Sequence, residues 1–589
     1  MNLRRQLSTS GLVFAALICA ASVTAQDAKV PVKEAVLENG MEILMVERHE
    51  SPTVTGGWLA QVGSVNEGVG ATGMAHLFEH MMFKGSRTVG TSDYEKEAEI
   101  IAKLDAVRLE MDVEYDAMRE AKRRGEIEGS IFLPENVTPR LAELRQEMKA
   151  LQDQQKEFIV NNEFDQIYTE AGGSGMNAGT WEDGTFYFNV VPSNKLELWF
   201  WMESERLLNP VFREFYSERD VVREERRQTV ESDPIAKFEE QFNFMFWGSV
   251  PYHHPVVGWP SDVESIGREA ANRFFATYYA PNNITVALVG DFESEKALAL
   301  AKKYFGRIPR GETSPPPVVT EEIEQLTERR MTAEADTNPS VQIRWHTVPF
   351  VHKDKFAIDV AEAILSGRTG RLYKSLVETE QIATGEPYAG VRAFKYGGFM
   401  EIGAELADGV DHQTVEDALL AEVERLQSEP VPERELQKVK NQSLADSYRR
   451  LQSNYYLMVQ LLWYTASGDK NYLNESSAKF QAVTAEDVQR VAKTYLTESG
   501  KNVLWYFRKE GSEEDPELAA LSGQAKAMAK QALAQINQVT DPAELEQGLA
   551  QMKAMAGQVP PEIKPAIELV IKRATERLEM LQAAAGEEE

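Results

Sequence analysis

The stretch Gly73-Met74-Ala75-His76-Leu77-Phe78-Glu79-His80-Met81-Met82-Phe83-Lys84-Gly85 decides the fold and the chemistry of this chain. His76 and His80 stand four residues apart, so on a helix both imidazoles leave the same face, one turn apart. Glu79 is three residues from His76 and projects beside them. Two neutral imidazoles placed in this way can bind zinc while a neighbouring carboxylate accepts a proton from water. The stretch therefore predicts a zinc-bearing helix with Glu79 as its base.

In the alternative interpretation, the two histidines are ordinary polar residues on the polar face of a helix and bind no metal. The chain has just eight histidines, so a chance match to His-x-x-Glu-His is uncommon at this composition. The same order of residues is a signature of zinc metallopeptidases. We therefore expect a metal centre rather than a structural pair.

The first 25 residues are typical of a secretory signal peptide. Arg4 and Arg5 form its positive start, and the apolar run Leu12 to Val23 is too short to span a bilayer. Val23-Thr24-Ala25 supplies small residues for cleavage before Gln26, which predicts export to the periplasm. An uncleaved membrane anchor is the alternative.

Composition narrows the choice of ligands and partners. Cys19 is the only cysteine and falls inside the predicted signal, so any metal must be held by His, Asp or Glu. The net charge is -30 and no basic block interrupts it, which excludes nucleic acid and anionic membranes as partners. A length of 589 residues, 43% of them apolar, predicts more than one core.

The order of predicted elements indicates an α+β protein of two related halves. Strand-like alternation within residues 36–70 precedes the zinc helix, and residues 284–290 form a buried strand. Beyond a Pro-rich linker the order repeats and ends in a strand at residues 503–507, which predicts two α/β sandwiches of similar plan. The predicted divisions are a signal at 1–25, a zinc-binding half at 26–308 with a helical hairpin inserted at about 103–165, a linker at 309–318, a second half at 319–510 and an acidic helical tail at 511–589.

Several motifs together resemble the pitrilysin/insulinase family of zinc peptidases, which includes the mitochondrial processing peptidases. The quoted stretch is one of them, and the segment Asn177-Ala178-Gly179-Thr180-Trp181-Glu182-Asp183-Gly184-Thr185-Phe186-Tyr187 is similar to the family's Asn-Ala-x-Thr-x-x-Asp-x-Thr-x-Tyr. Pro251-Tyr252 to Gly258-Trp259 and Tyr279-Ala280-Pro281-Asn282-Asn283 also match. The resemblance covers residues 35–507 and implies an exported bacterial zinc endopeptidase.

The family takes its third zinc ligand from a glutamate on a later helix, and the resemblance assigns this role to Glu225. Glu218 lies two helical turns earlier on the same face, where it would orient a metal ligand as a second carboxylate. Glu224 is the competitor for the ligand role and points about 100° away. The spacing from His80 to Glu225 is longer than is usual in the family, and the predicted hairpin accounts for the excess.

The resemblance also implies that Asn177 and Ala178 bind the backbone of a peptide substrate. The strand Val54 to Val62 and the strand after Asn177 are candidates for receiving that peptide as an added strand; the alternative is that both are ordinary sheet edges. His253 and His254 follow Pro251 in a predicted turn, so we expect them at the surface rather than at the metal.

The implied activity is zinc-dependent hydrolysis of unfolded peptides enclosed between two halves, with Zn²⁺ as cofactor. The alternative is a non-catalytic structural or peptide-binding subunit of the same family. Single-chain relatives supply an Arg and a Tyr from their second half, whereas the aligned positions here are Val377 and Thr384. Either Tyr388 or Arg392 substitutes for them, or the chain forms a dimer, with a related subunit that lacks the zinc motif or with a second copy.

Overall fold

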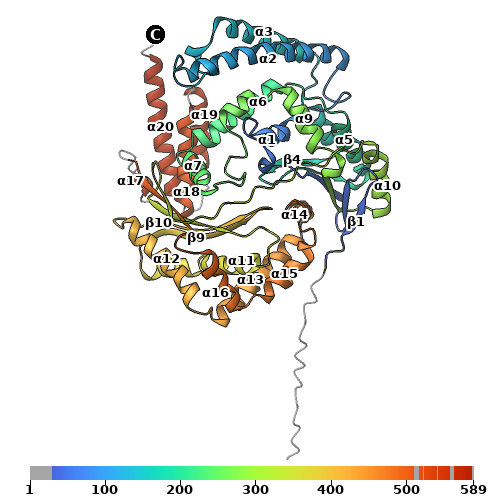
Figure 1. The fold of residues 1–589 in the computed structure, drawn as a ribbon. Coiled ribbons are helices and arrows are strands. Elements are labelled where there is room, and N and C mark those ends of the chain that lie inside the picture. The colour runs from blue at the N-terminus through green and yellow to red at the C-terminus, as the bar shows by residue number, and fades with distance from the viewer. Residues whose placement is uncertain are drawn as a thin grey trace, which may run out of the picture.

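The computed structural model describes residues 29–509, 516–519, 521, 523–539, 542–556 and 563–586 (Figure 1). The predicted signal peptide and its cleavage point before Gln26 lie outside these ranges. Within them, no helix combines the length and apolar character needed to cross a membrane.

The first half is built on a six-stranded sheet in the order β1-β2-β6-β3-β5-β4. Its strands are β1 (Lys33–Val36), β2 (Glu42–Glu47), β3 (Thr53–Ala60), β4 (Ser174–Trp181), β5 (Gly184–Pro192) and β6 (Ile284–Gly290). Strands β2 and β6 pair in parallel and the other neighbours are antiparallel. Every residue of β6 is buried, because this strand lies inside the sheet and both of its faces are covered. β4 forms one edge of the sheet.

The second half repeats this plan with five strands in the order β7-β11-β8-β10-β9. Its strands are β7 (Arg329–Ala335), β8 (Ser340–Thr347), β9 (Ala383–Ala393), β10 (Gly398–Leu406) and β11 (Lys501–Arg508). β7 and β11 are the parallel pair, as β2 and β6 are in the first half. The two strands matched by sequence, residues 284–290 and 503–507, fall in β6 and β11, which occupy equivalent places. The prediction of two related α+β halves is confirmed.

The helices of the second half cover one face of its sheet (Figure 1). They are α11 (Lys355–Leu365), α12 (His412–Ser428), α13 (Glu433–Leu451), α15 (Tyr472–Ala482) and α16 (Ala485–Tyr495). Their apolar sides and the sheet form one continuous core that includes Ile343, Leu419 and Val488.

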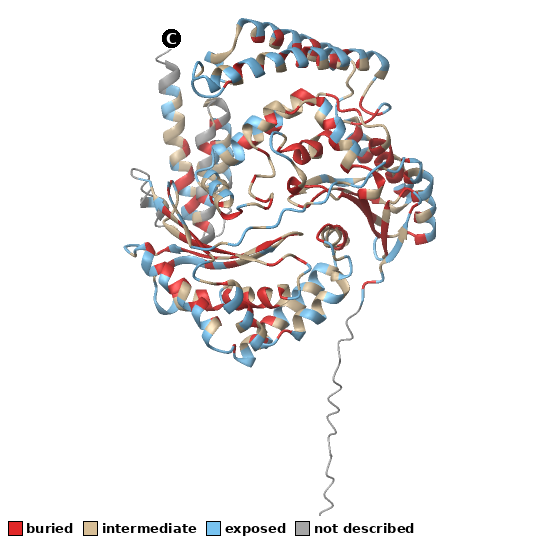
Figure 2. Ribbon diagram, viewed as in Figure 1, coloured by how far each residue is buried: buried red, intermediate tan, exposed pale blue. Residues whose placement is uncertain are grey.

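One helix of the second half packs on the sheet of the first. α14 (Asn454–Ala466) lies against β3 and β6, and its residues Leu457, Met458, Leu461 and Leu462 are buried there. They contact apolar side chains that the sheet turns away from the zinc helix, namely Leu44, Val46, Leu59, Ala287 and Val289. The two halves therefore share a core (Figure 2).

The predicted helical hairpin is present and lies beyond α6 in Figure 1. It consists of α2 (Tyr94–Arg123) and α3 (Pro139–Lys156), which pack along each other through residues such as Met111, Leu144 and Met148. Pro139 opens α3 and the hydroxyl of Thr138 caps it, accepting the N–H of Leu141. Buried Arg213 joins the hairpin to the body through Glu97, with Nε 3.0 Å from Oε1.

The remaining helices belong to the first half, where residues 236–246 pack against β7 of the second half, and to the tail, whose helices pack on one another. Those of the first half are α1 (Met74–Met81), α4 (Glu163–Glu170), α5 (Leu196–Leu208), α6 (Phe215–Arg226), α7 (Ala236–Phe246), α8 (Pro260–Ser265), α9 (Arg268–Tyr278) and α10 (Ser294–Tyr304). Those of the tail are α17 (Pro516–Ala519), α18 (Gly523–Gln538), α19 (Pro542–Met555) and α20 (Lys564–Gly586). Ala529, Leu545, Leu549 and Val570 belong to the small core of the tail.

Candidate metal centre

The helix that carries His76, Glu79 and His80 is α1, and its first turn is held from outside. Gly73 precedes it with a φ of 88°, where a Cβ would meet the carbonyl oxygen of Val257 at 2.7 Å. The buried carboxylate of Glu67 accepts the N–H of Gly73 at 2.8 Å and that of Ala75 at 2.6 Å. These N–H groups have no partner within the helix, so Glu67 satisfies them and fixes where α1 begins. Burial raises the pKa of Glu67 to about 8.

The sheet beneath α1 fixes how the helix is rotated. The hydroxyl of Tyr187 on β5 donates to the carbonyl of Phe78 at 3.0 Å, and its ring stacks on Trp58 of β3 with centroids 4.2 Å apart. Met74, Ala75, Leu77, Phe78 and Met81 are buried in the same core. With these side chains turned inward, His76, Glu79 and His80 face α6 and β4.

Glu225 on α6 meets both histidines of α1. Its Oε2 lies 3.7 Å from Nε2 of His76 and 3.4 Å from Nε2 of His80. One ligand atom from each of the three residues falls within 4.8 Å of the other two. Tetrahedral zinc with ligands at about 2.0–2.2 Å separates neighbouring donors by about 3.3–3.6 Å, so this donor set fits zinc. Across the described ranges, no other group of His, Cys, Asp and Glu side chains meets this criterion.

The three donors differ in their protonation. Burial lowers the pKa of His76, whose side chain is 11% exposed. Burial also disfavours protonated His80, but the carboxylates of Glu218 and Glu225 outweigh it and raise the pKa of His80 to about 9. His80 in turn lowers the pKa of Glu225. In the metal-free protein the protonated form of His80 is therefore stabilised by Glu218 at Nδ1 and by Glu225 at Nε2, and a bound cation would replace the proton on Nε2.

Glu218 lies on the same face of α6 as Glu225, and it contacts the other ring nitrogen of His80, Nδ1. Its Oε2 is 3.6 Å from Nδ1 of His80, and its Oε1 is 2.5 Å from Nζ of Lys84. Lys84 also contacts Glu214, at 3.1 Å. Burial alone would raise the pKa of Glu218, but His80 and Lys84 outweigh burial and lower it. A charged carboxylate at this nitrogen favours the imidazole orientation that presents Nε2 to a metal.

Glu79 is held by a contact that the sequence alone did not reveal. The hydroxyl of Thr180 on β4 donates to Oε2 of Glu79 at 2.7 Å. Thr180 belongs to the Asn-Ala-x-Thr motif, but its partner Glu79 lies 101 residues away in the chain. The bond leaves Oε1 as the oxygen of Glu79 that remains for proton transfer.

The two predicted substrate residues lie on a sheet edge beside α1. Asn177 and Ala178 belong to β4, which pairs only with β5, and α1 packs against this strand. The N–H of Ala178 donates to Oδ1 of Asn177 at 2.8 Å, so an incoming strand would have to displace this bond. The expectation for Val54 to Val62 is wrong, because β3 is paired on both sides, with β5 and β6, and has no free edge. β5 is likewise an interior strand.

The remaining candidates lie outside the cluster of donors. Glu224 is exposed and pairs with Arg227 at 2.6 Å. His254 is buried, contrary to its expected surface position, because it packs against Glu67 with Nδ1 3.9 Å from Oε2. Tyr388 and Arg392 lie on β9, the edge strand of the second sheet, and the ring of Tyr388 is close to Gly403. Val377 precedes this strand and Thr384 lies in it.

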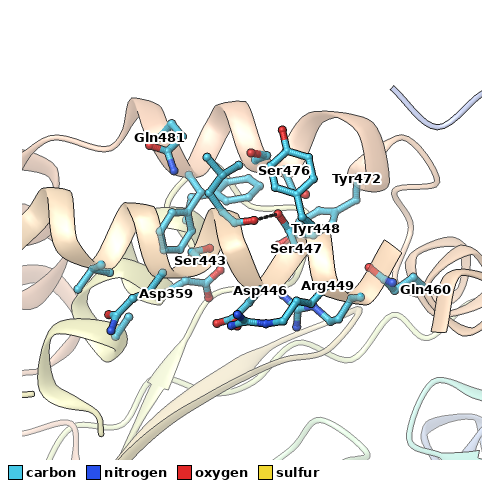
Figure 3. A pocket seen from close by; sticks show the side chains of 18 of the residues that line it. Asp359, Ser443, Asp446, Ser447, Tyr448, Arg449, Gln460, Tyr472, Ser476 and Gln481 are labelled. Atoms are coloured by element: carbon cyan, nitrogen blue, oxygen red, sulfur yellow. Dashed lines mark hydrogen bonds and ion pairs between the residues drawn. The ribbon is translucent and has the colours of Figure 1, made fainter. Parts of the chain in front are cut away.

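The second half has a cavity of about 970 Å³ beside α11, the helix that follows β8 as α1 follows β3 (Figure 3). Asp359 of α11 points into it, as do Asp446 of α13 and Tyr472 of α15. Nζ of Lys355 lies 2.6 Å from both Asp359 and the hydroxyl of Tyr472. A lysine thus neutralises the carboxylate here, and the cavity has no histidine in its lining.

Comparisons with known proteins agree with this geometry. The pattern described as "Insulinase (Peptidase family M16)" matches residues 42–107, and "Peptidase M16 inactive domain" matches residues 265–443. "Zinc protease PqqE" of Helicobacter pylori is 24% identical over 522 residues, which cover 86% of this chain and 98% of that protein.

Two solved structures share the fold. The crystal structure of a protease from Helicobacter pylori has a TM-score of 0.65 at 22% identity and covers 81% of this chain and 99% of its own. The periplasmic protease PqqL from Escherichia coli has a TM-score of 0.60 at 16% identity, with 85% of this chain matched to 50% of that one. By these matches and its His-x-x-Glu-His helix, the chain is similar in both halves to the M16 family of zinc peptidases, the insulinase and pitrilysin family.

Proposed function

We propose that this protein is a zinc-dependent endopeptidase that hydrolyses unfolded peptides laid along the free edge of β4. The observation that carries the proposal is the convergence of His76 and His80 on Oε2 of Glu225, at 3.7 and 3.4 Å, with Glu79 and an open sheet edge beside them. Zinc bound there would act as a Lewis acid on the scissile carbonyl and on water. Side chains of the protein would carry out proton transfer and substrate binding.

Glu79 would take a proton from the attacking water at Oε1 and return it to the leaving amine. Oε2 accepts the hydroxyl of Thr180, which would restrict rotation of the carboxylate and leave Oε1 for proton transfer. Asn177 and Ala178 would bind the substrate backbone once the bond between them opens. A peptide must be extended to pair with a strand edge, which favours unfolded chains over folded proteins as substrates.

We further propose that the active form is a dimer. This chain spans half the length of PqqL, so two such chains are needed to match that protein's size. The partner would be a second copy or a related subunit without the zinc motif, and light scattering on the purified chain, alone and with such a sibling, separates the two. The predicted export would place this dimer in the periplasm, and mature protein beginning at Gln26 in that fraction would support it.

The deciding experiment measures zinc content and peptide hydrolysis in the same preparations. Glu79→Gln should keep its zinc and lose hydrolysis, because it removes the base and no ligand. Glu225→Ala should lose zinc, whereas Glu224→Ala, which removes a neighbouring exposed carboxylate, should keep both properties. Full zinc occupancy in Glu225→Ala would refute the assignment of this ligand. Zinc without hydrolysis of any peptide in a library would favour the non-catalytic alternative.

A further inference from the structure

A second cavity, of about 530 Å³, separates the helical hairpin from the body of the protein. Its walls come from α2, α3, α6 and α8, and α1 takes no part in them. α6 therefore presents Glu218 and Glu225 to the histidines of α1 and other side chains to this cavity. Figure 1 shows the hairpin lying across α6.

Basic side chains dominate the lining of this cavity, in a protein whose net charge is -30. Six lining residues are basic and three are acidic: Arg108, Arg145, Lys149, Arg219, Arg223 and Arg227 against Asp220, Glu224 and Glu264. Four of the six cations have a carboxylate within 3.0 Å: Arg108 pairs with Asp112, Lys149 with Asp153, Arg223 with Glu264 and Arg227 with Glu224. Arg145 and Arg219 do not.

Arg219 carries a buried charge whose partners are the ring of Tyr216, with its centroid 5.6 Å from Cζ, and one distant carboxylate. Its side chain is 12% exposed, and its nearest carboxylate oxygen, on Asp220, is 3.6 Å from Nη2. Its Nε and Nη1 are buried without a hydrogen-bond acceptor anywhere in the described part of the chain. A guanidinium stays protonated, so it cannot relieve this cost by losing its charge. An anion in the cavity would supply the missing partner.

Arg145 faces the same space from α3. Its one hydrogen bond within the described residues is a long one, from Nη2 to the hydroxyl of Tyr115 at 3.4 Å. Met111, Tyr115, Phe132 and Met148 form an apolar wall beside these two cations. The cavity thus joins a cationic end to an apolar body, and its volume suits a small organic molecule.

We propose that this cavity binds a small organic oxyanion, a phosphate ester or a carboxylate, with its charged group on Arg219 and Arg145 and its apolar part against Met111, Phe132 and Met148. The two arginines offer fork-shaped donors that match the oxygens of either group. The ligand would bridge the hairpin and α6. This inference is independent of the peptidase activity.

Isothermal titration of the zinc-loaded protein with phenyl phosphate, 3-phenylpropionate and inorganic phosphate tests the proposal. We expect one molecule of an aromatic probe to bind per chain, and inorganic phosphate to bind at least about tenfold more weakly because it leaves the apolar wall uncovered. The better of the two aromatic probes identifies the head group. Phosphate binding as tightly as either probe would overturn the proposed apolar subsite.

Substitutions of Arg219 and Arg145 test whether the aromatic probes bind in this cavity. Arg219→Gln should weaken it by about tenfold or more, since a charge-assisted bidentate contact is lost, and Arg145→Gln should weaken it by a smaller factor. Arg140→Gln is the matched control, because Arg140 is an exposed residue of α3 already paired with Glu110 and Glu143, and its affinity should equal that of the wild type. Zinc content equal to that of the wild type in each variant would show that the metal centre is unchanged, so that anions bound there cannot produce this pattern.

Two results would overturn the inference. One is the absence of binding to the wild-type protein at about 10 mM of both aromatic probes. The other is equal affinity in the wild type, Arg219→Gln and Arg145→Gln, each shown by circular dichroism to be folded. If Arg219→Gln fails to fold, Arg145→Gln alone decides, because Arg145 is half-buried and has one long hydrogen bond to lose.

Discussion

Replacing Thr180 with valine would test whether the base is held by the strand opposite it. The substitution keeps the β-branched shape of the side chain and removes only the hydroxyl that donates to Oε2 of Glu79 at 2.7 Å. A hydrogen bond to a charged group contributes about 1.5–3 kcal/mol. If the bond orients Glu79 for proton transfer, its loss should lower kcat by about tenfold to a hundredfold.

The assay is steady-state hydrolysis of a fluorogenic peptide together with zinc analysis of the same sample. KM should change little, because Thr180 is assigned to positioning the base Glu79, whereas substrate binding is assigned to Asn177 and Ala178. Zinc content should stay at the wild-type level, since Thr180 lies on β4 whereas His76 and His80 lie on α1 and Glu225 lies on α6.

Thr180→Ser is the matched control, because it restores the hydroxyl while removing a methyl group. Its kcat should recover most of the loss. Activity of Thr180→Val within about twofold of the wild type would refute the positioning role. Equal losses in the serine and valine variants would refute it as well, because they would point to strand packing rather than to the hydrogen bond.

Three further changes test the surroundings of the site. Glu218→Ala removes the carboxylate at Nδ1 of His80 and should weaken zinc binding by about 10- to 100-fold in a chelator competition, while unchanged affinity would contradict its orienting role. Asp183→Ala leaves the O–H donor of Tyr252 and the N–H of Lys395 without an acceptor at the junction of the halves, so the free energy of unfolding should fall by about 2–4 kcal/mol; a loss under about 1 kcal/mol in thermal unfolding would argue against it. Burial lowers the pKa of His346 to about 4. As the pH falls below about 6.5, the unfolded chain therefore binds this proton before the folded protein does, and stability is lost towards pH 4. His346→Phe, which preserves the stack on Phe246, should remove about 2 kcal/mol of the difference in stability between pH 7 and pH 5, and parallel pH curves for the two proteins would refute this.

The sequence predicts the local parts of this site well. His76, Glu79 and His80 lie within five residues on one helix, so helical periodicity alone places them together. The same holds for Glu218 and Glu225 on α6. Bringing Glu225 to the histidines required the family resemblance, because 144 residues and the whole hairpin intervene between His80 and Glu225.

Contacts between distant strands could not be predicted in this way. Alternation marks β3 as a strand but does not say which strands flank it, so its interior position came only from the pairing with β5 and β6. The bond from Thr180 to Glu79 and the burial of His254 against Glu67 also depend on how separate segments meet. The boundaries of the halves at 308, 318 and 510 remain predictions, and the shared core under α14 shows why sequence divisions and packing units need not coincide.

The position of α14 bears on how this protein can be divided for expression. A fragment that ends in the linker at 309–318 would contain β1 to β6 but not the helix that covers their outer face. Leu44, Val46, Leu59, Ala287 and Val289 would then form a contiguous apolar surface open to water, the kind of surface that drives aggregation. Such a fragment should become soluble when residues 319–509 are co-expressed as a separate chain. The polypeptide would thus behave as a split protein: neither fragment forms a stable domain alone, and the two fragments together restore the native fold.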